Sequence, residues 1–247
     1  MDADNRLAQL EPQVSKQLSL FVERLKSLYA ERLIGMMLFG SVARGAYVPK
    51  KSNLNLLVGL NKVGSQELLD YRKIRTEVEK LPFVAPLFLD PDYVRFSADS
   101  FPLEFLDISS FYVLLFGKNV LEQVTIDPQL LRLQLERELK GKLLRARQAF
   151  LETNGEPARL AEILSRSFTA LRVIFFGMVY LKENRTVAEA DELIQKVGAD
   201  FGLDTARLLQ AGRARTGEMK ASGPEMEKIF FDYLEELSKL AGKLDLM

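Results

Sequence analysis

The stretch that decides the fold is LFGSVARGAYVPKKSNLNLLV, residues 38–58. An apolar run, residues 33–39, leads into its two glycines, and a second apolar run, residues 54–60, follows a polar turn. Short apolar runs bounded by turn residues predict two strands. A helix that starts directly after a strand presents unpaired backbone N–H groups, and glycine lets an anion approach them. The stretch therefore predicts a phosphate-binding turn.

The candidate binding residues of this turn are Gly40, Ser41 and Arg44. The Ser41 hydroxyl can donate to a phosphate, and Arg44 can pair with either a phosphate or a nearby acid. A P-loop is excluded, because that motif needs Lys and then Ser or Thr after its second glycine, and Ala46-Tyr47 stand there. On the second strand, alternation places positions 53 and 55 on one face and positions 54 and 56 on the other.

This pattern resembles the signature of the polymerase-β-like nucleotidyltransferases, especially the small bacterial branch that includes the aminoglycoside nucleotidyltransferases. The match comprises Gly40-Ser41, Ala43-Arg44-Gly45, and Ser52 followed by the alternating strand. The resemblance implies an α+β fold with a mixed β-sheet flanked by helices, followed by a C-terminal α-helical bundle. It also implies a nucleoside triphosphate as ligand and Mg²⁺ held by two aspartates at positions 53 and 55.

The chain departs from that family pattern at the metal site, because Asn53 and Asn55 replace the two aspartates. Mg²⁺ dehydrates reluctantly and normally keeps one or two carboxylates, so two neutral amides predict weak Mg²⁺ binding. The family's third carboxylate lies on a later strand, for which the best match is Glu104, a candidate catalytic residue and metal ligand. Asp107 would lie on the opposite face of that strand.

Three functions follow from this departure. The first is a nucleotidyltransferase-fold protein with an impaired metal site that retains nucleotide binding or serves as a scaffold or regulatory module. The second is an active Mg²⁺-dependent enzyme that uses Glu104 to move a nucleoside monophosphate from a triphosphate to a hydroxyl of a small molecule or protein. The third is an interaction protein built on the helical half. Against these stand plainer interpretations: an ordinary turn at 40–45, surface amides at 53 and 55, and a solvated Glu104.

Composition narrows the chemistry further. The chain has no His, no Cys and no Trp, which excludes thiol and imidazole catalysis and leaves oxygen-ligand chemistry. The balance of 34 Lys+Arg against 34 Asp+Glu gives no support to generic nucleic-acid binding. The longest apolar run, residues 168–181, is too short to span a membrane, and the N-terminus lacks an apolar signal region. We therefore expect a cytoplasmic protein with no membrane partner; a homo-oligomer stays open.

Near residue 125 the sequence pattern changes from short apolar runs that alternate with helical stretches to helical periodicity almost throughout. This change predicts two domains, residues 1–125 and 126–247. In the first, we expect helices over 14–31 and 65–81, strands over 84–89 and 103–108, a loop over 90–102, and a strand or short helix over 110–115. In the second, we expect five helices, over 127–153, 156–183, 187–200, 203–211 and 224–244.

The first of these five helices is basic, with Arg132, Arg137, Lys140, Lys142, Arg145 and Arg147 against Glu136, Glu138 and Glu152. Its cations could meet an anionic partner, or form a solvated face in which Glu138 and Lys142 pair one turn apart.

Overall fold

The fold was analysed in a computed structural model, which describes residues 3–50, 52–78, 85–214 and 222–245. The chain forms two compact units, Met1–Ile126 and Asp127–Met247. The predicted division at residue 125 lies next to this boundary.

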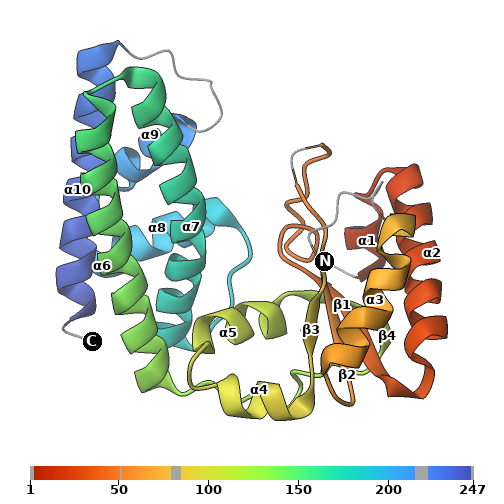
Figure 1. The fold of residues 1–247 in the computed structure, drawn as a ribbon. Coiled ribbons are helices and arrows are strands. Elements are labelled where there is room, and N and C mark those ends of the chain that lie inside the picture. Colours follow the sequence, from red (N-terminus) through yellow and green to blue (C-terminus); the bar gives the residue numbers. More distant parts are fainter. Residues whose placement is uncertain (1–2, 51, 79–84, 215–221, 246–247) are drawn as a thin grey trace. The chain divides into compact units, whose positions relative to one another are not determined.

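The first unit is built on a four-stranded mixed sheet in the order β3-β2-β1-β4 (Figure 1). The strands are β1 (Leu33–Phe39), β2 (Asn55–Leu60), β3 (Leu87–Leu89) and β4 (Tyr112–Gly117). β1 runs antiparallel to β2 and β4, whereas β2 and β3 are parallel. Phe39, the last residue of β1, pairs with Asn55 on one side and Tyr112 on the other. This register places the two predicted motif segments side by side.

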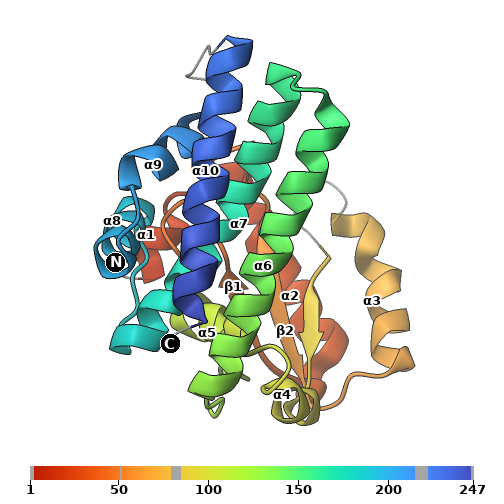
Figure 2. The same cartoon turned by 90° about the vertical axis from the view of Figure 1, so that its left-hand side faces the viewer.

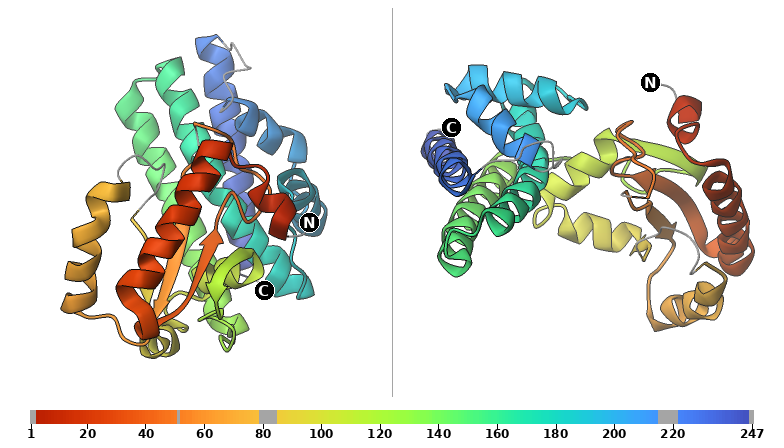
Figure 3. Two further views of the ribbon diagram at one scale, coloured as in Figure 1. Left: turned by 90° about the vertical axis from the view of Figure 1, so that its right-hand side faces the viewer. Right: turned by 90° about the horizontal axis from the view of Figure 1, so that it is seen from above.

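Helices cover both faces of this sheet (Figure 3). α2 (Pro12–Tyr29) and α3 (Ser65–Val78) lie on one side, while α4 (Pro91–Ser97) and α5 (Pro102–Ser110) lie on the other. On the α2 side, the rings of Tyr29 and Phe88 meet edge to face at 5.9 Å. On the other side, apolar residues of β1, β2 and β3 pack with those of α4 and α5 in one buried cluster, which contains Met37, Leu57, Leu89, Val94, Phe105, Ile108 and Leu121. A short helix, α1 (Ala3–Leu7), and a 3-10 turn, η1 (Ala30–Arg32), complete the unit.

The predicted strand over 103–108 is wrong, because these residues form helix α5. Its buried residues, Pro102, Leu103, Phe105, Leu106 and Ile108, fit a helical stripe as well as a strand. Pro102 at the start of the helix is the signal that separates the two, since proline is favoured in a first helical turn and disfavoured inside a strand. The predicted loop over 90–102 likewise contains helix α4, capped by Asp90, whose carboxylate accepts the Tyr93 N–H at 2.7 Å.

The other predicted elements of the first unit are present with shifted ends. The helix over 65–81 begins at Ser65 and is seen to Val78, and residues 79–81 lie outside the described part of the chain. The strand over 84–89 is β3, which is shorter, and residue 84 also lies outside the described residues. Of the residues 110–115, for which a strand or a short helix was predicted, Ser110 ends α5 and Tyr112 begins β4, so most of this range is a strand.

The second unit is a helical bundle of α6 (Pro128–Thr153), α7 (Pro157–Glu183), α8 (Ala190–Phe201), α9 (Thr205–Ala214) and α10 (Gly223–Leu244). The three long helices α6, α7 and α10 lie side by side (Figure 2). Asp127 caps α6 as predicted, accepting the Gln129 N–H at 2.7 Å. The predicted five helices are confirmed, although α8 begins later than expected, at Ala190.

Helix α7 is the apolar centre of this bundle. By length and composition it is the one helix in the described residues that could cross a membrane. Its apolar residues Leu160, Leu164, Leu171, Ile174, Phe175, Phe176, Met178 and Val179 are buried, and α6, α8, α9 and α10 all pack on it. The Arg172 guanidinium within this run donates to the Ala188 carbonyl at 2.7 Å, which supplies the partner that a cation on a core helix needs.

Candidate functional site

The turn that follows β1 is a single helical turn rather than the start of a longer helix. The Arg44 N–H donates to the Gly40 carbonyl at 3.1 Å, and the Ala46 N–H donates to the Ser41 carbonyl at 2.8 Å. Gly40 and Gly45 adopt φ values of 75° and 73°, in the left-handed region that favours glycine. The two glycines therefore bracket a closed turn at the end of the central strand.

The middle of the turn is buried, and the N–H groups of Arg44, Gly45 and Ala46 donate to carbonyl groups within the turn. Val42 and Ala43 are completely buried and anchor it in the core, so their backbone N–H groups do not face solvent. Gly40 and Ser41 are half-buried. The groups that can meet a ligand are therefore the Ser41 hydroxyl and the backbone of these two residues, a smaller set than the sequence predicted.

Asn55 lies directly against Gly40. A Cβ atom built on Gly40 would lie 2.5 Å from the Asn55 amide nitrogen, which is too close for any larger residue. Asn55 is half-buried and Asn53 is exposed, while Leu54 and Leu56 between and beyond them are buried. The predicted alternation of β2 is thus confirmed. The absence of a side chain at Gly40 makes room for the Asn55 amide, a role that the sequence assigned to a phosphate.

Arg44 is engaged by an acid. Its side chain is 6% exposed and forms an ion pair with Asp107, whose side chain is 17% exposed. The guanidinium also lies 4.2 Å from the centre of the Phe111 ring, within the range of a cation–π contact. Of the two partners that the sequence allowed for Arg44, the structure supplies the acid, and the pair joins the turn to α5.

Glu104 lies in the first turn of α5 and is exposed, so its predicted place on a strand is wrong. The error changes its relation to Asp107. On a strand the two residues would point to opposite faces, whereas three residues apart on a helix they share one face. Because Asp107 contacts the turn through Arg44, Glu104 lies on the same face of α5, one helical turn earlier.

These residues do not fit a magnesium site. Mg²⁺ takes oxygen ligands in octahedral geometry and usually one or two carboxylates, and here the strand that borders the turn offers the amides of Asn53 and Asn55. The neighbouring strand β3 is entirely apolar, Leu87–Leu89, and Asp90 beyond it is used as a helix cap. Within the described residues, no three acidic, His or Cys side chains come together as a metal-binding group.

The polar loop between the turn and β2 is closed by Ser52. Its hydroxyl accepts the Val48 N–H at 3.0 Å, and its own N–H donates to the Val48 carbonyl at 2.8 Å. Lys50 sits at the tip with a φ of 64°, and Lys51 lies outside the described residues. Ser52 thus has a structural task in bringing Asn53 and Asn55 back beside the turn.

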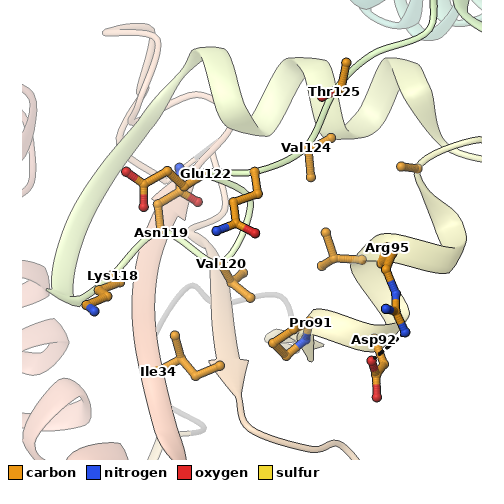
Figure 4. A pocket seen from close by; sticks show the side chains of 13 residues that line it. Ile34, Pro91, Asp92, Arg95, Lys118, Asn119, Val120, Glu122, Val124 and Thr125 are labelled. Atoms are coloured by element: carbon orange, nitrogen blue, oxygen red, sulfur yellow. Dashed lines mark hydrogen bonds and ion pairs between the residues drawn. The ribbon is translucent and has the colours of Figure 1, made fainter.

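A cavity in the first unit lies away from this turn. It has a volume of about 620 Å³, with Ile34 of β1, α4 and the segment after β4 around it (Figure 4). Ile34 stands near the start of β1, whereas Gly40 follows its end, so the cavity and the turn lie at opposite ends of the strand. At its rim Asp92 and Arg95 pair with each other at 3.1 Å. No sequence motif marks this cavity, because its lining comes from three separate segments.

Comparison with known proteins supports the fold. No protein-family model matches the chain, and no curated protein matches it in sequence. Among solved structures, a spectinomycin adenyltransferase from Enterococcus faecialis, crystallised with ATP and spectinomycin, matches with a TM-score of 0.55 over 90% of this chain and 98% of that chain. The sequence identity is 13%, so the likeness concerns the fold. The chain therefore has the α+β fold of a nucleotidyltransferase with a helical C-terminal region.

Proposed function

We propose that this chain is a nucleotidyltransferase-fold protein with an impaired metal site that retains nucleoside-triphosphate binding at the Gly40 turn. The observation that carries the proposal is the pair Asn53 and Asn55 beside an intact turn. The solved adenyltransferase that shares the fold was crystallised with ATP, which makes ATP the first ligand to test.

The impairment follows from charge. Phosphoryl and nucleotidyl transfer depend on metal ions that neutralise the negative charge developing on the phosphate oxygens. Two amides have the shape of two carboxylates without their charge, and the apolar strand β3 adds none. A protein with these residues binds a triphosphate through backbone and hydroxyl groups and lacks the metal that would activate it.

Binding is assigned to Gly40 and Ser41, with Arg44 as a positioning residue. The Ser41 hydroxyl and the half-buried backbone at 40–41 are the donors available at the end of β1. Arg44, held by Asp107 and Phe111, keeps the turn in place rather than contacting the phosphate. Such a module fits a scaffold or regulatory role in which nucleotide binding is the signal.

The test is calorimetric titration of the full chain with ATP, once with Mg²⁺ and once with EDTA, together with an assay for nucleotidyl transfer. We expect the same affinity in both conditions, a weaker affinity for Ser41→Ala, and no transfer. Strictly magnesium-dependent binding with turnover would overturn the impairment, and no binding in either condition would overturn the retained nucleotide site.

A gain-of-function variant sharpens this test. Asn53→Asp combined with Asn55→Asp restores two carboxylates, and we expect ATP binding to become stronger with Mg²⁺ than with EDTA. The matched control is Asn119→Asp, which adds a carboxylate beside the cavity at the other end of β1. If the control gains the same magnesium dependence as the double variant, the position of the two amides is not what limits the metal.

One observation favours a second candidate, an active transferase that uses Glu104. Glu104 and Asp107 share a face of α5, and Asp107 contacts the turn. In this case the unmodified chain would transfer a nucleoside monophosphate to a hydroxyl, and Glu104→Gln would abolish the transfer without weakening ATP binding. Transfer that survives Glu104→Gln would exclude Glu104 from the chemistry.

A further inference from the structure

The helical unit contains a cavity of its own between α6 and α7, with a volume of about 360 Å³. Its volume lies at the lower end of the range typical of small-molecule sites. The space is left by three alanines, Ala146 and Ala149 on α6 and Ala170 on α7, because larger side chains at these positions would fill the gap between the helices. The alanines give the cavity an apolar floor.

Three cations line this cavity. Lys142 and Arg145 reach it from successive turns of α6, and Arg166 reaches it from α7. None of the lining residues in the described part of the chain is acidic. A small cavity with three cations around an apolar floor is a suitable environment for an anion attached to an apolar group.

Lys142 is the most buried of the three cations. Its side chain is 16% exposed, and its ammonium lies 3.9 Å from the nearest Glu138 oxygen, at the limit of an ion pair. Burial lowers the pKa of Lys142, and Arg145 lowers it further, while Glu138 opposes both effects. A bound anion would favour the charged ammonium that the surroundings now disfavour.

The other polar groups leave room for such an anion. Arg166 pairs with Glu162 at 2.6 Å, but both side chains are largely exposed, so the pair is weak and can be exchanged. The Ser167 hydroxyl and the buried Tyr233 hydroxyl are 2.6 Å apart, which fixes the Ser167 side chain at the cavity wall.

We propose that this cavity binds a phosphorylated small molecule, with the phosphate between Lys142, Arg145 and Arg166 and an apolar ring over Ala146, Ala149 and Ala170. All residues that line this cavity belong to the helical unit, whereas the residues of the proposed nucleotide site belong to the first unit, so the proposal goes beyond that site. Planar guanidinium groups match phosphate oxygens in pairs, which favours phosphate over a single carboxylate.

The methyl groups of the three alanines can report ligand binding directly. In the full chain labelled with ¹³C at alanine methyl groups, nuclear magnetic resonance titrations with AMP, inorganic phosphate and adenosine separate the phosphate from the ring. We expect AMP to shift the signals of Ala146, Ala149 and Ala170 saturably, phosphate to shift them more weakly, and adenosine to leave them unchanged. Ala43 reports the Gly40 turn in the same spectra.

Variants decide whether the response belongs to this cavity. Arg145 and Arg166 are exposed, so Arg145→Gln and Arg166→Gln keep the fold, and each should weaken AMP binding about tenfold through loss of a charge-assisted hydrogen bond. The control is Arg147→Gln, an exposed position on α6 that does not line the cavity and should leave the affinity unchanged.

Three results would overturn the proposal. The first is an absence of shifts at the three cavity methyl groups. The second is an equal loss of affinity in all three arginine variants, which would indicate general charge attraction. The third is a response confined to Ala43, which would assign AMP to the Gly40 turn and leave the cavity without a ligand.

Discussion

Arg44 and Lys142 are both largely buried cations, with side chains 6% and 16% exposed, but their surroundings differ. Arg44 stands in the sequence motif and is matched by Asp107 and the Phe111 ring. Lys142 stands in no motif, has one acid at the limit of ion-pair distance, and faces an open cavity. A motif position therefore does not by itself assign a cation to a ligand. The cation whose charge is left unmatched is the better candidate.

The largest expected effect comes from breaking the Arg44–Asp107 pair. Arg44→Met or Asp107→Leu leaves one buried charge without its partner and should lower the free energy of unfolding by about 3 kcal/mol. The double variant should recover most of this loss, since two apolar side chains replace the pair. Urea unfolding of the four proteins measures the coupling.

If the two single variants are as stable as the parent, Arg44 is not a structural residue. The contrast with Lys142 then fails, and a direct role of Arg44 toward a phosphate becomes the better interpretation.

A smaller effect is expected at Gly40. Gly40→Ala forces a left-handed backbone on alanine and presses its Cβ against the Asn55 amide, and we expect a loss of about 2 kcal/mol. Gly202→Ala is the matched control, because Gly202 has a φ of 63° with nothing within 4 Å of an added Cβ.

Gly202→Ala should therefore lose only the stability that a left-handed backbone costs an alanine, about 1 kcal/mol. Thermal unfolding compares the two variants. Equal losses would show that Asn55 can move away and that Gly40 is not required for its placement.

The smallest effect, of opposite sign, is expected at Lys142. Lys142→Met removes a cation whose charged form is disfavoured by burial, and should raise the free energy of unfolding at pH 7 by about 0.5–1 kcal/mol. A decrease similar to that of Arg44→Met would erase the difference between the two cations.

The pH dependence of the free energy of unfolding tests independently whether Lys142 lowers the stability of the folded state. Burial lowers the pKa of Lys142 in the folded state below the ordinary value of 10.5, so the folded state releases this proton first as pH rises. The stability contribution of Lys142 therefore rises between its folded pKa and about pH 10.5, and is lost again as pH falls. Lys142→Met should lack this rise, which denaturant titrations at several alkaline pH values measure.

Much of the first unit could be predicted from local pattern. β1 and β2 follow from apolar runs bounded by turn residues, and the acid–proline pair at 127–128 marks the start of α6. The same pair at 90–91 marks α4, a signal that the sequence analysis passed over. The strand at 103–108 failed for a physical reason: over so few residues, apolar positions fit both a period of two and a period of 3.6.

The sequence was sufficient to predict which residues form the candidate site, but not which of them contact one another. Asn53 and Asn55 share a strand face because side chains alternate, which requires no tertiary information. The contact of Asn55 with Gly40 depends on the register between β1 and β2. The pairing of Arg44 with Asp107 depends on where α5 packs. A local sequence pattern does not determine the distance between α5 and the turn.

The residue order alone determined that this chain offers no thiol or imidazole side chains, and that amides stand at positions 53 and 55, where the resemblance predicts metal-binding acids. These are properties of residue types, which folding does not change. The pairing of Arg44 with Asp107 and the cationic cavity between α6 and α7 arose from tertiary packing. Charges and cavities act through distances, and distances between segments far apart in the chain exist only once the chain has folded.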